Sequence, residues 1–287
     1  QAGKTPSTLW LLLAMAAVAL VAELWRARSG HTGSWSATLL WCVGFPAVAA
    51  VLALGVKPSS LLLQSITALV LVMPMGPLLY RVAYRPVANA SVLLLLIISV
   101  ALHGVLVGLG LLFFGAEGSR TTPFSESKFD IADISVSGQA LVVLGVALVL
   151  VVSLFVFFER SMLGKALRAT AINRVGARLM GIPTALAGDL SFALAALIGA
   201  ISGLLIAPLT TVYYDTGFMV GLKGFVAAII GGLASYPLAL AGALLVGLLE
   251  SFSTFWASAY KEVLVFAMII PLLWWRSRNS HHVEEEE

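Results

Sequence analysis

The chain has 287 residues, of which 60% are hydrophobic and 11% are charged, with a mean hydropathy of +1.01 and a formal net charge of +3. Soluble domains carry about 25% charged residues, so this composition excludes a water-soluble globular protein and indicates that lipid surrounds most of the chain. Cys42 is the single cysteine, which also excludes an internal disulfide.

Apolar runs of about 20 residues, the length that crosses a bilayer as a helix, recur along the whole chain. They predict nine spans, at 8–25, 36–56, 60–80, 91–114, 138–158, 184–206, 218–233, 237–257 and 262–276. The seventh and ninth spans are short, and glycines interrupt the seventh, which is typical of a re-entrant or broken helix. We therefore expect an all-α polytopic transmembrane bundle of about eight or nine spans, in one domain covering residues 1–287.

The basic residues predict the orientation of the spans, because cytoplasmic loops carry an excess of Lys and Arg. If the nine spans alternate, 11 of the 17 basic residues share one face and 6 the other. The larger set is Arg26, Arg28, Arg81, Arg85, Arg160, Lys165, Arg168, Arg174, Arg178, Arg276 and Arg278. This face is predicted to be cytoplasmic, which places the N-terminus outside and the C-terminus inside.

The longest predicted outward loop covers residues 116–137. It contains Pro123, many Ser and Thr residues, and four acidic against two basic side chains. This composition is typical of a solvated, flexible connector. The alternative is a docking surface for an external partner.

The sequence contains no recognisable catalytic or metal-binding constellation. Its histidines show no metal-ligand spacing to any cysteine; they are His31, His103, His281 and His282. Gly164 and Lys165 are followed by Ala166, where a phosphate-binding loop needs Ser or Thr. We therefore expect no enzyme activity, no metal and no cofactor in this chain.

An ionisable residue within a span costs several kcal/mol unless it is paired or wetted. His103, Asp189 and Glu250 are thus candidates for a translocation pathway. The alternatives are a buried, hydrogen-bonded His103, an Asp189 at the cytoplasmic interface, and a Glu250 that serves packing. The three do not form the chain of carboxylates that a proton-driven carrier uses.

Small residues four positions apart favour close helix contacts. Three pairs of glycines in or beside spans have this spacing: Gly104 and Gly108, Gly199 and Gly203, and Gly217 and Gly221. They predict tight packing within the bundle.

The most unusual stretch is GKALRATAINRVGARLMGI, residues 164–182, where basic residues interrupt the apolar blocks. As one helix it would place Leu163, Leu167, Ala171, Val175 and Leu179 on a single stripe at successive i+4 positions. Its arginines lie off that stripe. One interpretation is an interfacial helix that binds anionic lipid; the other is a helix presented to a cytoplasmic partner.

This stretch resembles the cytoplasmic coupling segment of ATP-binding-cassette importer permeases of the branched-chain amino acid class, specifically the LivH-type subunit. The matching positions are Gly164, Ala166, Leu167, Arg168, Ala169, Ala171, Asn173, Ala177, Gly181 and Ile182. Residues 80–91 resemble the family's basic cytoplasmic turn, and residues 221–251 with 258–266 resemble its Gly-rich C-terminal part. The resemblance covers about residues 60–276; the family's Ile-Asn-Phe-Ala-His-Gly-like element is not found before residue 60.

The resemblance implies a permease subunit in a bacterial inner membrane, with no nucleic-acid partner and with lipid around its spans. Its implied partners are two ATPase subunits, a second, LivM-type permease and an external substrate-binding protein. Segment 159–183 would contact an ATPase, with Leu167 and Met180 filling an apolar cleft. The implied coupling residues are Gly164, Lys165, Leu167, Arg168, Asn173, Arg174, Arg178 and Gly181.

The expected substrate is a branched-chain or related amino acid, since few fixed charges line the expected path. Urea, short amides and aromatic acids fit nearly as well. Two competing classes are an ion-coupled secondary transporter, which predicts paired carboxylates within the membrane, and a structural membrane subunit without a pathway.

Overall fold

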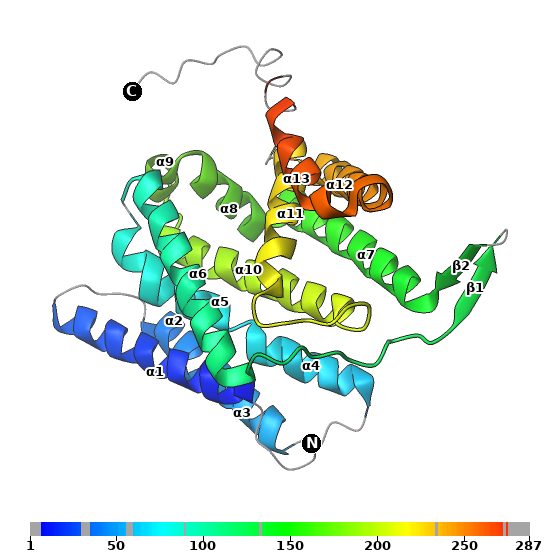
Figure 1. The fold of residues 1–287 in the computed structure, drawn as a ribbon. Helices are drawn as coiled ribbons and strands as arrows, with labels where there is room; N and C mark the ends of the chain where they lie inside the picture. Colours follow the sequence, from blue (N-terminus) through cyan, green and yellow to red (C-terminus); the bar gives the residue numbers. More distant parts are fainter. Residues whose placement is uncertain are drawn as a thin grey trace. The chain divides into compact units, whose positions relative to one another are not determined.

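The computed structural model describes residues 7–29, 35–55, 60–88, 90–131, 134–232, 235–271 and 274. Helices make up nearly all of this part of the chain, which confirms the predicted all-α fold (Figure 1). The elements are α1 (Ser7–Arg28), α2 (Trp35–Leu39), η1 (Leu40–Gly44), α3 (Phe45–Gly55), α4 (Leu61–Val72), α5 (Met75–Leu79), η2 (Tyr80–Tyr84), η3 (Arg85–Val87), α6 (Val92–Phe114), β1 (Lys128–Ile131), β2 (Ile134–Ser137), α7 (Gly138–Arg160), α8 (Met162–Ile172), α9 (Arg174–Leu179), α10 (Thr184–Ile206), α11 (Thr216–Ile230), α12 (Tyr236–Ala257), η4 (Ser258–Tyr260) and α13 (Lys261–Ala267).

Within the described residues, seven helical segments are long and apolar enough to cross a membrane. Six of them match the first six predicted spans, although the third continues to Val87. The predicted seventh span is α11, an apolar helix of only 15 residues. The last two predicted spans fall in one candidate, Tyr236–Pro271, which the turn η4 interrupts; residues 272, 273, 275 and 276 lie outside the described residues.

The chain divides into two compact units, which are described separately. Unit 1 comprises Gln1–Val146 and Phe157–Tyr214, and unit 2 comprises Ala147–Val156 and Asp215–Glu287. The core of unit 1 joins α1, η1, α3, α4 and α5 through Leu9, Leu12, Ala16, Ala19, Cys42, Ala49, Leu71 and Leu78. The core of unit 2 joins α11, α12 and α13 through Val226, Ala227, Val246 and Val265.

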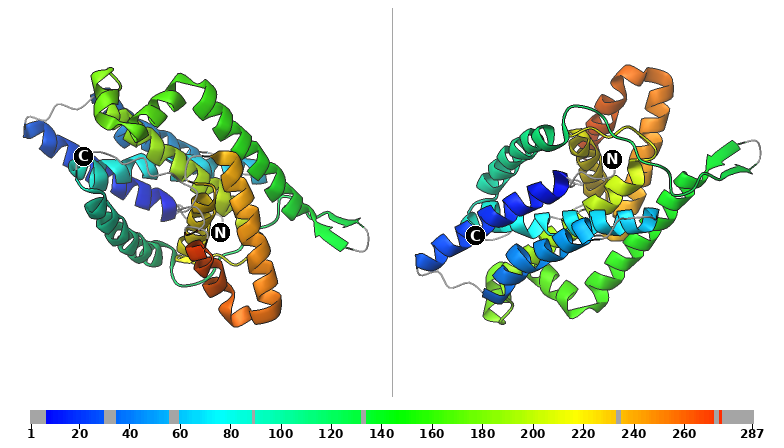
Figure 2. Two further views of the ribbon diagram at one scale, coloured as in Figure 1. Left: turned by 90° about the horizontal axis from the view of Figure 1, so that it is seen from above. Right: turned by 90° about the horizontal axis from the view of Figure 1, so that it is seen from below.

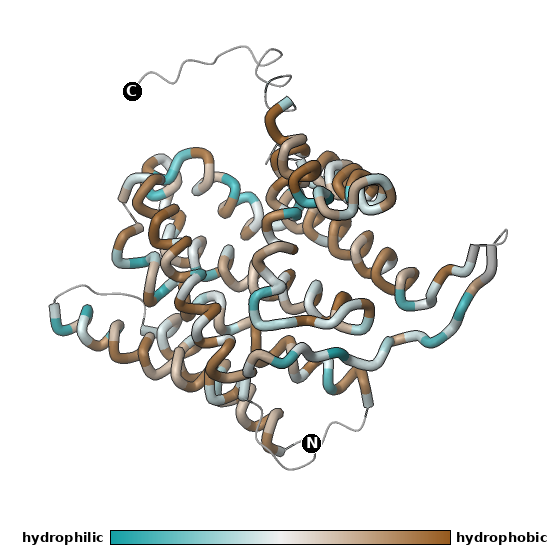
Figure 3. Tube along the Cα trace, viewed as in Figure 1, coloured by the Kyte–Doolittle hydropathy of each residue, from teal (hydrophilic) through white to brown (hydrophobic). Residues whose placement is uncertain are grey.

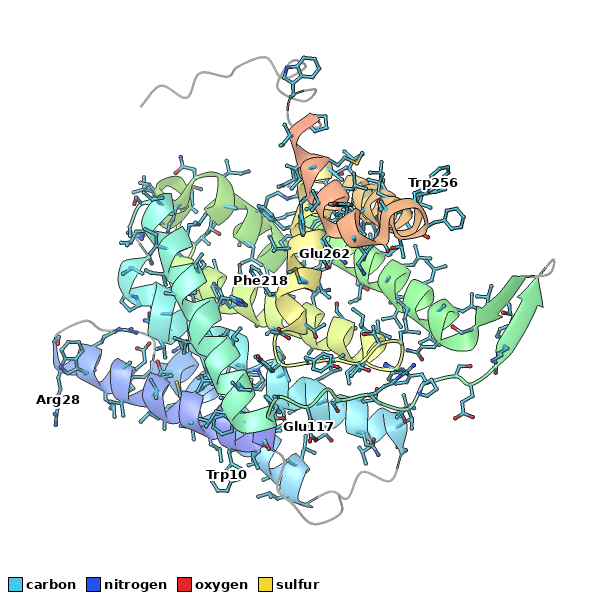
Figure 4. The ribbon with its side chains drawn as sticks, in the orientation of Figure 1. Trp10, Arg28, Glu117, Phe218, Trp256 and Glu262 are labelled. Atoms are coloured by element: carbon cyan, nitrogen blue, oxygen red, sulfur yellow. The ribbon has the colours of Figure 1, made fainter. Side chains whose placement is uncertain are left out.

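Long helices carry apolar side chains around their whole circumference. α6 and α7 are hydrophobic along most of their length (Figure 3), and the most apolar 18-residue stretch of each contains no buried residue. Trp10 on α1 and Trp256 on α12 point away from their helices (Figure 4). A helix that is apolar on its exposed side is stable only against lipid or another protein, as expected for membrane spans.

Side-chain caps fix where several helices begin. Ser60, Ser91, Ser137 and Ser161 each precede a helix and accept a hydrogen bond from the backbone N–H three residues later. Such a cap satisfies a donor that the first helical turn leaves free, and it contributes about 0.5–2 kcal/mol. These serines set the boundaries between apolar runs.

The predicted contacts at the three pairs of small residues are wrong for the described part of the chain. A Cβ placed on Gly104, Gly199 or Gly217, or on the glycine four positions after each, would meet nothing within 4 Å. Close approach occurs instead at Gly76, where a Cβ would overlap the backbone of Phe192. Spacing alone failed because it does not say which face of a helix meets a neighbour.

The predicted flexible connector at 116–137 contains ordered structure. β1 and β2 pair antiparallel, with Lys128 opposite Ser137, and extend beyond the start of α7 (Figures 1 and 2). An isolated bridge also joins Ser119 to Val212. Arg120 Nε donates to the carbonyl of Pro208 at 3.1 Å. The loop is therefore fastened to the segment that follows α10.

Candidate functional site: the α8–α9 segment and the ionic cluster

The basic run is two helices rather than one, so the predicted continuous apolar stripe is wrong. α8 ends at Ile172, and Asn173 takes an extended conformation with φ −145°. The Asn173 side chain then accepts a hydrogen bond from Gly176 N at 2.7 Å and caps α9. Asparagine favours such caps because its short side chain competes with the helical backbone.

Two residues of the matched motif hold α8 against the rest of unit 1. A Cβ on Gly164 would overlap the carbonyl of Phe157, so only glycine permits this close turn between α7 and α8. Leu167 is 6% exposed and lies inside the chain. The expectation that Leu167 fills a cleft in a partner is therefore wrong, because its side chain is already buried.

Gly181 ends α9. It adopts φ +79°, in the left-handed region that favours glycine. Its N–H donates to Arg178 O at 3.0 Å, and Ile182 N donates to Ala177 O at 3.0 Å. This is the bond pattern of a Schellman motif. Gly181 and Asn173 thus shape the segment through the backbone.

The basic side chains of the segment differ in their surroundings. Arg174 Nη1 donates to the carbonyl of Ala88, which ties α9 to the end of η3. Arg168 pairs with Glu159 at 2.9 Å on the surface. Lys165 and Arg178 are exposed. Of the predicted coupling residues, these last three present charge to the outside.

Exposed apolar side chains lie on the same segment as those charges. They are Met162, Leu163, Ile172, Val175, Leu179 and Met180, of which Met162, Ile172, Leu179 and Met180 are more than 80% exposed. Single exposed apolar residues are ordinary, but a group rimmed by charge marks an interaction surface. We call this group, with Lys165, Arg168 and Arg178, the α8–α9 surface.

An ion pair is buried within the spans of unit 1. Arg81 is 2% exposed and Asp189 3% exposed. Arg81 Nε donates to Asp189 Oδ1 at 3.0 Å, and Nη2 donates to Oδ2 at 2.5 Å. This bidentate geometry is the strong form of an arginine–carboxylate pair. Asp189 is therefore buried and held by an ion pair in this structure.

A second carboxylate extends the pair into a cluster. Glu23 of α1 contacts Arg85 at 2.5 Å, Arg26 at 3.0 Å and Arg81 at 4.0 Å. Arg81 Nη1 also donates to Thr38 Oγ1 at 3.0 Å. Every buried side-chain nitrogen or oxygen among the described residues has a hydrogen-bond partner. We call Glu23, Arg26, Thr38, Arg81, Arg85 and Asp189 the ionic cluster.

Most of the ionic cluster escaped the sequence analysis. Glu23 lies in the first predicted span, so the criterion that selected Asp189 selects it too. Arg81 and Arg85 were assigned to a cytoplasmic turn, whereas the span continues to Val87 and buries Arg81. The pairing itself joins residues 108 positions apart, and no local pattern predicts it.

The other two candidate pathway residues are not members of the ionic cluster. Glu250 of α12 accepts from Lys223 Nζ of α11 at 2.5 Å, within unit 2. Both side chains are partly exposed. His103 lies in α6 and is half-buried. Lys223 thus lies inside a helix as half of an ion pair.

The sequence matches a known family over most of its length. The family described as the branched-chain amino acid transport system permease component matches residues 12–273. The match begins well before residue 60, so it extends the resemblance into the first two spans. No solved structure is significantly similar to the chain.

Three relatives illustrate the similarity. The high-affinity branched-chain amino acid transport system permease protein LivH of Salmonella typhimurium is 31% identical over 240 residues, 80% of this chain and 78% of the relative. LivH of Escherichia coli K12 is 30% identical over the same shares. The corresponding protein BraD of Pseudomonas aeruginosa is 27% identical over 79% of this chain and 76% of its own.

Proposed function

The chain belongs to the family of permease components of branched-chain amino acid transport systems and is a permease subunit of an ATP-binding-cassette importer; on this premise we propose that the α8–α9 surface docks on an ATPase subunit. The supporting observation is the exposure of Ile172, Leu179 and Met180 beside Lys165, Arg168 and Arg178. A helix pair that ends in apolar side chains ringed by positive charge fits an apolar cleft with an acidic rim.

The α8–α9 segment is fixed to the neighbouring spans, so a displacement of the segment would displace those spans too. Gly164 and Leu167 hold α8 against the chain, and Arg174 holds α9. α10 begins five residues after α9 ends, and Asp189 in its second turn is fastened to Arg81. A shift of the segment on ATP binding would thus move α10 and the spans of the ionic cluster together.

The remaining assembly follows from the same proposal. The importer would contain two ATPase subunits, a second homologous permease and an external binding protein, in a bacterial inner membrane. Basic residues gather at one end of unit 1, where Arg26 and Arg174 bond to the backbone of residues 81 and 88. By the positive-inside rule this end faces the cytoplasm, with the N-terminus outside and the C-terminus inside. The substrate would be a branched-chain or related amino acid.

Charge reversal on the α8–α9 surface tests the docking. Arg178→Glu combined with Met180→Asp should abolish co-purification of the ATPase subunits and ATP-driven uptake in proteoliposomes. Both side chains are exposed, so insertion and folding should persist. Lys128→Glu with Phe129→Asp, the same changes on the exposed β1, should retain the ATPase subunits.

Two results would contradict the proposal. One is full retention of the ATPase subunits and of uptake in the double variant. The other is uptake by the purified chain alone on an ion gradient, which would establish the secondary-transporter alternative.

A further inference from the structure

A cavity of about 300 Å³ lies beneath the α8–α9 segment, entirely within unit 1. Its walls come from η2, the first turn of α6, the end of α8 with Arg174, and the first turns of α10. The volume is at the small end of the range of about 300–1,000 Å³ that is usual for ligand pockets. The segment and the spans both contribute to its walls.

One side of the cavity is aromatic. The ring centroid of Phe192 lies 5.3 Å from that of Tyr80 and 4.9 Å from that of Tyr84. A Cβ on Gly188 would overlap the Tyr80 ring, so this glycine lets the ring lie against α10. Leu95 and Leu167 add aliphatic surface. This side suits an apolar group.

The lining of the cavity also carries a cation. Arg174 is the one charged residue among the described residues that line the cavity. A guanidinium has five N–H donors, and within the described residues only the Ala88 carbonyl accepts from it. Hydroxyls of Thr170, Thr184 and Ser191 also line the cavity. The remaining donors of Arg174 suit a carboxylate, which arginine binds through two parallel hydrogen bonds.

We propose that this cavity binds a small carboxylate with a short apolar body, with the carboxylate on Arg174 and the body against the rings of Tyr80, Tyr84 and Phe192. The ligand class follows from one cation, an aromatic wall and limited volume. An anionic lipid headgroup offers the same chemistry of an anion on an apolar body, but two acyl chains exceed the cavity.

Such a ligand would bridge the α8–α9 segment to η2 and α10. A ligand bound in the cavity would restrain the segment and slow ATP-driven uptake; this consequence rests on the proposed coupling role. Because the same end of unit 1 is proposed to face the cytoplasm, the ligand would enter from the side on which imported amino acids accumulate. The cavity would then act as a product-sensing site.

Binding can be measured without the ATPase subunits, so the result does not depend on the coupling role. The full chain in phosphatidylcholine nanodiscs is titrated with 3-methylbutanoate, a branched monocarboxylate, by calorimetry. Arg174→Gln should weaken binding at least tenfold, whereas Arg178→Gln, on the exposed side of α9, should leave it unchanged. Ala171→Phe, which fills the rim while keeping Arg174, should also weaken binding at least tenfold. Val175→Phe, four residues on and outside the cavity, should not.

Absence of binding, or binding that both Arg174→Gln and Ala171→Phe leave unchanged, would overturn the proposal. A second arm replaces part of the phosphatidylcholine with phosphatidylglycerol. Retained affinity for 3-methylbutanoate in these discs supports a soluble carboxylate. Loss of that affinity at an ionic strength that screens the negative disc surface would show that the site takes an anionic headgroup, and would overturn the product-sensing role.

Discussion

Arg81 and Asp189 lie 108 positions apart in the chain, yet their side chains meet through two hydrogen bonds of 3.0 and 2.5 Å in the interior of unit 1. The pair joins η2, at the end of the third candidate span, to the second turn of α10. α10 is the helix that the α8–α9 segment leads into. The pair therefore connects the helix that follows the α8–α9 surface to the third candidate span.

Removing one member of this pair should destabilise the protein strongly. Asp189→Asn leaves the buried Arg81 guanidinium without its bidentate carboxylate and with only the more distant Glu23, and breaking a buried pair in this way costs about 3–5 kcal/mol. Arg81→Met should have a similar effect. The readout is the midpoint of thermal unfolding of the purified chain in detergent, followed by fluorescence-detected size exclusion.

Two controls separate burial from charge pairing. Glu159→Gln breaks the exposed pair with Arg168 and should change stability by at most about 1 kcal/mol. Arg81→Met with Asp189→Leu removes both charges and should restore most of the stability lost by either single change. If the double variant is no more stable than the single ones, the pair is not the source of the effect.

Gly76→Ala should impair folding, because the new Cβ would overlap the Phe192 carbonyl where α5 crosses α10. The backbone cannot yield as a flexible side chain can. Gly199→Ala is the matched change in α10, where a Cβ meets nothing within 4 Å, and it should stabilise the helix by about 0.5–1 kcal/mol. Expression of folded protein and the unfolding midpoint measure both; equal behaviour of the two variants would refute the close contact.

Asn173→Ala should loosen α9, since the Gly176 N–H loses its acceptor. The expected cost is about 0.5–2 kcal/mol locally, visible as faster amide exchange in α9. Asn173→Asp keeps the acceptor and should behave like the natural chain. If the coupling proposal holds, an importer assembled with the alanine variant should show reduced uptake per ATP that its ATPase subunits hydrolyse. Unchanged exchange in both variants would show that the cap does not hold α9.

The sequence predicted the spans well because lipid imposes one rule on each of them separately. About 20 apolar residues suffice, whatever their neighbours, so the runs near 91–114, 138–158 and 184–206 coincide with helices of the structure. The helix break at Asn173 was missed because the i+4 pattern of Leu167 and Ala171 continues through it. Asn173 is a common helix-capping residue, but the apolar periodicity on both sides of it predicts one continuous helix.

The ionic cluster was missed for a different reason. Counting Arg81 and Arg85 as loop residues assumed that basic side chains mark the end of a span. Here Glu23 and Asp189 neutralise them, and the helix continues to Val87. Pairing between distant spans depends on the tertiary fold. The charged residues of the ionic cluster could be found from sequence, but their burial and their pairing required the structure.

Lys223 and Glu250 provide the last prediction, which concerns the pathway. Their 2.5 Å ion pair joins α11 to α12 among apolar residues, and both side chains are partly exposed. A zwitterionic amino acid carries the same two charges. Its carboxylate can therefore pair with Lys223 in place of Glu250, and its ammonium can pair with Glu250 in place of Lys223. If substrate passes here, Lys223→Gln with Glu250→Gln should fold normally but raise the KM for uptake about tenfold or more.

The charge-swapped variant, Lys223→Glu with Glu250→Lys, distinguishes a pathway role from packing. It keeps the ion pair, so a packing role predicts the same stability and the same uptake as the unsubstituted chain. A pathway role predicts natural stability with an altered KM, since the substrate then meets its two charges in reversed positions. Uptake measured over a range of leucine concentrations in reconstituted vesicles decides between them; an unchanged KM in both double variants would exclude this pair from the pathway.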